Sequence, residues 1–170
     1  MKFRYAAIVL AVFAVAAPAL GAEVVFTAAL RGDKEPTNTG SNASGDAKIV
    51  VDTATQTVDV DLKVTGIRFA DFYDQVHHAP VGPIHMHHYA ANGDVTLVMP
   101  FPMGPSYAET KDGFTVTLKD YPYATGAKIV ETPLSFDQFL GALKAGIVVL
   151  NIHTDKFNQG EISGKVTDAK

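Results

Sequence analysis

The histidines are the most concentrated chemical feature of this chain. Six occur, of which five lie within residues 77–88 and the sixth is His153. Over residues 84–87 imidazoles alternate with apolar side chains, which is typical of a half-buried β-strand. His85 and His87 would then project together from the face opposite the core, about 7 Å apart along the strand. Two imidazoles at this spacing can lean toward one metal ion.

A second predicted strand brings the distant histidine to a similar position. Over residues 147–154 apolar side chains again occupy alternate positions, which leaves His153 on the other face. The loop 155–159 suits a hairpin, and antiparallel register then sets His153 opposite Glu161, with Cβ atoms ~5 Å apart. Glu161 could accept a hydrogen bond from the His153 ring and fix its tautomer, or could itself be a ligand.

This donor set predicts a transition-metal site. The chain has no cysteine, and imidazoles without thiolates suit copper, zinc or nickel better than calcium or magnesium. We therefore expect copper or zinc on His85, His87 and His153, with Glu161 as a ligand or as a hydrogen-bond partner of a ligand. The alternative interpretation is that these histidines are polar surface residues that hydrogen-bond to the loops around them.

Other sequence features point away from known catalytic centres. His77 and His78 fall in a predicted loop, and His88 falls on the side of its predicted strand that faces the core. We therefore interpret each of the three as structural or solvated. The chain has no GxSxG elbow, P-loop, HExxH motif or dinucleotide fingerprint. The absence of cysteine excludes thiol catalysis and disulfides. The sequence establishes no enzymatic activity and favours a non-enzymatic role.

Short alternating segments separated by turn residues must position these histidines. They predict strands over residues 24–30, 46–51, 57–65, 84–89, 94–99, 114–119, 147–154 and 161–167. One short helix interrupts the pattern: Ser135 and Gln138 form a capping box, and Phe139 and Leu143 recur at helical spacing. These elements predict an all-β fold, a Greek-key sandwich or barrel with the helix covering an edge or one end.

The N-terminus has the pattern of a secretory signal peptide. Two basic residues precede an apolar run over residues 5–17, and a proline and small residues follow. The run is shorter than the ~20 residues that span a bilayer. We expect residues 1–21 to be removed, which leaves one domain over 22–170, secreted or periplasmic, with no membrane span. This domain has 12 basic and 18 acidic residues, which argues against nucleic-acid partners and anionic membranes.

Several blocks of the sequence resemble the CHRD domain, a family first described in chordin and widespread in bacterial exported proteins. The similar blocks follow the family's order: residues 26–36, 44–47, 84–87, 92–93, 151–154 and 160–164. They include His85, His87, His153 and Glu161. The segment before residue 84 is longer and richer in histidine than usual, and Ser163 stands where the family has arginine. The resemblance implies an immunoglobulin-like or superoxide-dismutase-like β-sandwich outside the cytoplasm, and no defined activity.

Three functions are compatible with these observations. The first is an exported domain that binds copper or zinc through the histidine cluster. The second is a non-catalytic structural or protein-binding module of the cell envelope, whose partner would be an envelope or extracellular protein. The third is a superoxide-dismutase-like enzyme, an analogy at the level of the fold alone. Metal analysis, a search for a protein partner and a dismutase assay distinguish the three.

Overall fold

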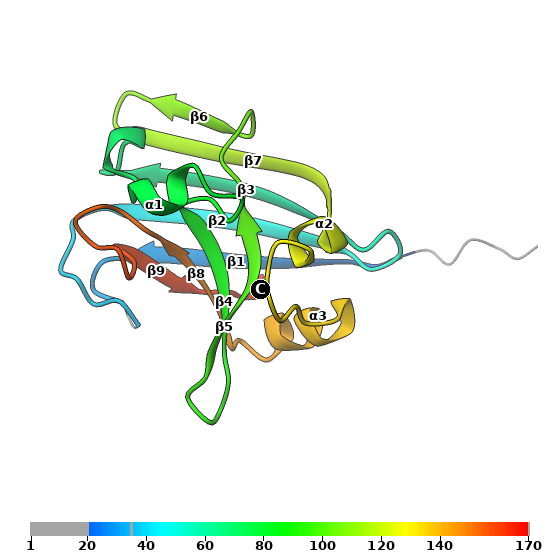
Figure 1. Cartoon of the computed structure of the whole chain (residues 1–170). Coiled ribbons are helices and arrows are strands. Elements are labelled where there is room, and N and C mark those ends of the chain that lie inside the picture. The colour runs from blue at the N-terminus through cyan, green and yellow to red at the C-terminus, as the bar shows by residue number, and fades with distance from the viewer. Residues whose placement is uncertain (1–20, 35, 170) are drawn as a thin grey trace, which may run out of the picture.

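The computed structural model describes residues 21–34 and 36–169 (Figure 1). Its strands are β1 (Glu23–Arg31), β2 (Ser44–Asp52), β3 (Thr57–Thr65), β4 (Ile84–Tyr89), β5 (Val95–Phe101), β6 (Tyr107–Thr110), β7 (Gly113–Pro122), β8 (Val148–Ile152), β9 (Ile162–Lys165) and β10 (Thr167–Asp168). Its helices are the 3-10 turn η1 (Phe69–Asp71), α1 (Asp74–His77), α2 (Tyr123–Ala127) and α3 (Phe136–Lys144). Within these described residues, no helix is long and apolar enough to cross a membrane. The predicted signal peptide lies outside them, except for Gly21.

All ten strands belong to one antiparallel sheet, and the all-β prediction is confirmed. The order across the sheet is β5-β4-β8-β9-β1-β2-β3-β7-β6, and β10 pairs with β1. Figure 1 shows β4 and β5 crossing in front of β1, β2 and β3, so the sheet curls over on itself. The two layers expected of a sandwich are therefore the two ends of one continuous sheet, and one hydrophobic core joins residues from both ends.

Strict alternation explains why β3 forms where the sequence predicts it. In β3 the four apolar side chains Val58, Val60, Leu62 and Val64 are buried, and the residues between them face outward to varying degrees. Burying one face of a strand in this way removes apolar surface from water and fixes its register. The predicted ranges 57–65 and 84–89 match β3 and β4 at both ends.

The predicted helix is α3, and it begins as the capping box requires. The Ser135 side chain accepts a hydrogen bond from the Gln138 backbone N–H, and the Gln138 side chain accepts one from the Ser135 N–H. Phe139 and Leu143 on its inner face are fully buried. No sequence pattern predicted β6 or α2. One strand was predicted at 161–167, where the chain forms β9 beside β8 and then β10 beside β1.

The pairing of β4 with β8 is the part of the fold that positions the histidines. Ile84 lies opposite Ile152 and His85 opposite Asn151. On its other edge β4 pairs with β5, with a bulge between Met86 and His87 that leaves the alternation within β4 unchanged. Ile84 and Met86 are fully buried in the core, so the histidines between and after them take the opposite face.

Candidate metal centre

The structure brings three of the predicted site residues together. His85 and His87 come from β4, and His153 directly follows β8. Each ring offers one nitrogen, and these three nitrogens lie within 4.8 Å of one another. The ring centroids of His85 and His153 are 4.7 Å apart, and those of His87 and His153 are 5.9 Å apart. The expected convergence of two strands on one point is therefore present, whereas metal binding itself stays a prediction.

Backbone carbonyls fix the tautomers of two of the rings. Nε2 of His85 lies 2.8 Å from the Gly82 carbonyl oxygen, and Nδ1 of His153 lies 2.9 Å from that of Asn158. Because a carbonyl oxygen only accepts, each of these nitrogens must carry the proton and donate it. In the neutral rings the other nitrogen of each, Nδ1 of His85 and Nε2 of His153, therefore has a bare lone pair.

The two bare nitrogens face each other at 3.1 Å. Two lone pairs at this distance repel, and a cation between them or beside them removes the repulsion. Two nitrogens bound to one tetrahedral zinc ion at ~2.0–2.1 Å would lie roughly 3.3 Å apart, close to the observed spacing. Nε2 of His87 is also buried without a hydrogen-bond partner. This donor set fits a transition-metal ion, with each ring of the facing pair held from behind by a carbonyl, as metal-binding histidines usually are.

Burial keeps the cluster neutral. The pKa of His85 is lowered to about 3, mainly because the ring is removed from water and secondly because the neighbouring rings repel its charged form. Burial and then repulsion from His153 lower the pKa of His87 to about 4. Burial also lowers the pKa of His153, although its hydrogen bond to the Asn158 carbonyl opposes this shift. At neutral pH all three rings therefore present unprotonated nitrogens, the form that binds a metal ion.

Glu161 does not join the three histidines. Its carboxylate accepts hydrogen bonds from Ser41 Oγ at 2.6 Å and from Thr154 Oγ1 at 2.7 Å. The hydrogen bond that we expected between His153 and Glu161 is not formed, because the proton on His153 Nδ1 goes to the Asn158 carbonyl. In this structure Glu161 stabilises the loops around the end of β8.

A local irregularity explains this difference. Ile152 lies opposite Ile162, which is the register expected for the hairpin. Beyond that pair the Glu161 N–H donates to the Ile152 carbonyl instead of continuing the ladder to His153. The preceding residue, Gly160, has φ of +120°, a conformation that is essentially restricted to glycine. The regular alternation on which the prediction relied therefore ends one residue too early.

We did not predict from the sequence the carbonyl groups that orient the rings. Gly82 has φ of +70°, and a Cβ there would overlap the backbone of β5 at Phe101, so only glycine fits this position. Its carbonyl is thereby placed against His85. A glycine three residues before a histidine is the one sequence signal for this contact. The carbonyl of Asn158 leaves no side-chain signal at all, because every residue carries a carbonyl.

The other three histidines lie outside the cluster. The rings of His77 and His78 stack on each other with centroids 4.6 Å apart, and His78 is exposed. His77 ends α1 and packs its edge against Phe72. His88 is half-buried near the end of β4. None of them belongs to the group that could hold an ion among the described residues.

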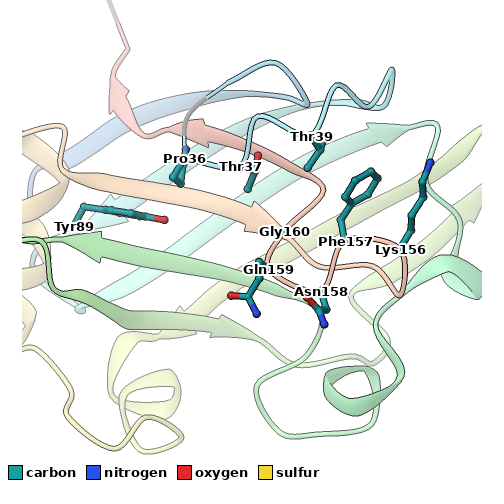
Figure 2. Close-up of a pocket in the computed structure, with 9 residues that line it drawn as sticks. All are labelled: Pro36, Thr37, Thr39, Tyr89, Lys156, Phe157, Asn158, Gln159 and Gly160. Atoms are coloured by element: carbon teal, nitrogen blue, oxygen red, sulfur yellow. The ribbon is translucent and has the colours of Figure 1, made fainter.

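A surface pocket of about 480 Å³ borders the loop that holds His153 (Figure 2). Figure 2 shows the side chains of Asn158 and Gln159 on one side, Tyr89 on another and Lys156 at one end, beneath the loop that carries residues 36–39. The carbonyls of Asn158 and Gln159 bond to His153 and Asn151. One short loop therefore serves both the histidine cluster and the wall of this pocket.

Comparison with known proteins places the chain in a family. A family model described as the CHRD domain matches residues 26–166, which include all three clustered histidines and β1 to β9 nearly in full. No curated protein and no solved structure matches the chain. Since the family model covers most of the sequence, the chain belongs to the CHRD domain family.

Proposed function

We propose that this protein is an exported CHRD domain that binds a copper or zinc ion through His85, His87 and His153. The observation that carries the proposal is the pair of bare ring nitrogens 3.1 Å apart, each belonging to a ring whose only proton is donated to a backbone carbonyl. A cation is the ligand that satisfies both nitrogens at once. The neutral state of the buried rings and the unpartnered Nε2 of His87 support the same proposal.

The export part of the proposal rests on the N-terminal residues. Basic residues, an apolar run and small residues follow one another as in a secretory signal peptide. A transition-metal site without cysteine also suits an oxidising compartment, since its ligands cannot be lost to disulfide formation. Fractionation of cells that express the full chain, with N-terminal sequencing of the product, tests both cleavage near residue 21 and location.

The metal proposal is tested on residues 22–170 purified without a histidine tag. The protein is loaded with Zn²⁺ or Cu²⁺, dialysed, and analysed for bound metal per chain. We expect one equivalent in the wild type, and none in the triple variant His85→Ala, His87→Ala, His153→Ala. The double variant His77→Ala, His78→Ala is the matched control, since it removes two histidines outside the cluster and should keep one equivalent. Equal metal retention by the triple variant and the wild type would refute the proposal.

A purely structural role is the second candidate, and one observation favours it. His85 and His153 tie loop carbonyls to the sheet, which is what a loop-organising histidine does. This role predicts that His85→Gln and His153→Gln lower the melting temperature equally with and without added metal. The metal proposal predicts that Zn²⁺ raises the melting temperature of the wild type alone. A dismutase assay after copper loading tests whether a bound metal is also catalytic.

A further inference from the structure

Asn151 is a buried polar residue beside the histidine cluster. It lies directly opposite His85 in the β4–β8 ladder, where side chains on one face have Cβ atoms ~5 Å apart. It also precedes His153 by two residues, and the His153 ring, which follows the strand, lies 3.1 Å from the His85 ring. Its side chain is 3% exposed. A polar residue this deeply buried requires a partner for each of its polar atoms.

The surroundings of Asn151 fix which amide atom lacks a partner. Nδ2 donates to the Gln159 carbonyl oxygen at 3.3 Å, and because a carbonyl only accepts, the amide cannot be reversed. Oδ1 is then left buried without a hydrogen-bond partner. The carboxamide packs against the backbone of Gly160, where any Cβ would overlap it. The amide is therefore held in one orientation with an unused acceptor.

The unused acceptor belongs to the residue that lies opposite His85 and two positions before His153, whose bare ring nitrogens face each other. A buried acceptor without a donor is unfavourable, and a cation held by these ring nitrogens would also accept a lone pair from Oδ1. We propose that Asn151 is the fourth protein ligand of the metal centre, with Oδ1 completing a set of three nitrogens and one oxygen. This inference rests on the proposed function of the histidine cluster.

The added oxygen has consequences for metal preference. Three imidazoles and one amide oxygen suit the tetragonal N,O geometry of Cu²⁺ and the four-coordinate geometry of Zn²⁺, whereas Cu⁺ prefers sulfur ligands. All four ligands are neutral, and the carboxylate of Glu161 is bonded to Ser41 and Thr154. Placing a carboxylate at position 151 would therefore add a charged oxygen beside a cation that no acidic side chain of the cluster neutralises.

Two variants separate a ligand from a residue that only supports the loop. Asn151→Ala removes the oxygen and the hydrogen bond to Gln159, whereas Asn151→Asp keeps an oxygen but loses that hydrogen bond. We measure Cu²⁺ affinity by competition with a chelator and record the electron paramagnetic resonance spectrum of bound Cu²⁺. Circular dichroism verifies that each variant is folded, and Asn158→Ala, which keeps its backbone carbonyl, is the control for changes in the loop.

If Asn151 is a ligand, Asn151→Ala lowers Cu²⁺ affinity by more than about 10-fold, since even the loss of an outer-shell partner costs about 10- to 100-fold. Asn151→Asp then binds at least as tightly as the wild type, and both variants change the cupric spectrum. Wild-type affinity and an unchanged spectrum in Asn151→Ala would overturn the inference while the histidine site stands. Equal weakening in both variants would also overturn it, since a loop support predicts that result. Absence of Cu²⁺ and Zn²⁺ binding by the wild type would overturn the proposed function as well.

Discussion

Lowering the pH from 7 to 5 should weaken metal binding at His85, His87 and His153 far less than at three exposed histidines. Protons compete with metal ions for imidazole nitrogens, so an exposed histidine site loses its metal as the rings become protonated. In this protein burial is the main cause that lowers the pKa of His85 to about 3 and that of His87 to about 4. Both rings are therefore still neutral at pH 5, where ordinary histidines are charged.

The size of the effect follows from these pKa values. An imidazole with the ordinary pKa of ~6.5 loses ~25-fold in metal affinity between pH 7 and pH 5, so three of them lose roughly 15,000-fold. His85 and His87 together lose only ~1.1-fold over the same range. Burial also lowers the pKa of His153, so its share stays below ~25-fold. The predicted loss of affinity is therefore under ~25-fold, roughly 600 times smaller than for three exposed histidines.

The assay is a competition titration of Zn²⁺ between the protein and a chelator of known pH dependence, at pH 7, 6 and 5. A flexible peptide with three histidines, measured in parallel, supplies the reference for ordinary pKa values. Circular dichroism at each pH verifies that the protein remains folded. A loss of about 1,000-fold or more by the folded protein would refute the argument that burial protects these rings from protonation.

Three further predictions concern stability. In the metal-free protein, His85 and His87 have lower pKa values than in the unfolded chain, so the unfolded chain binds protons at a higher pH than the folded one. The free energy of unfolding should therefore fall by up to ~2.5 kcal/mol from pH 7 to pH 5.5, and an unchanged urea midpoint would contradict this. Gly82→Ala should lower the free energy of unfolding by more than ~2 kcal/mol and weaken Zn²⁺ binding. Gly93 has open space around it, so Gly93→Ala should lower the free energy of unfolding by only ~1 kcal/mol and leave Zn²⁺ binding unchanged. Phe139→Ala, which empties a fully buried position, should cost ~3–5 kcal/mol in thermal unfolding, and a loss below ~1 kcal/mol would show that α3 adds little to the core.

The parts of the fold that could be predicted from the sequence are those with a strong local pattern. Strict alternation predicted β3 and β4, and a capping box predicted the start of α3. By contrast, β6 is a short edge strand with three of its four residues exposed, so it has no alternation to read. The segment that forms α2 contains a glycine and a threonine within five residues, and both residue types have weak helix propensity.

The same reasoning explains what could be predicted of the site. Side-chain parity along β4 and β8 placed three histidines on one face, and the structure brings them together. The hydrogen bond expected between His153 and Glu161 does not form, because one irregular hydrogen bond after Gly160 ends the alternation that the prediction used. The carbonyls behind His85 and His153 could not be predicted, since contacts of the main chain depend on loop conformation and leave no pattern in residue types.

Neither strand that carries the cluster lies at an edge of the sheet. β4 is flanked by β5 and β8, and β8 is flanked by β4 and β9, so both strands are tied to neighbours along each side. Such a scaffold deforms little when an ion arrives, and the ion has to adopt the coordination that the scaffold offers. We therefore expect discrimination among metals to come from stiffness: ions that tolerate the preset arrangement would stay bound, and ions that need the strands to separate would be released.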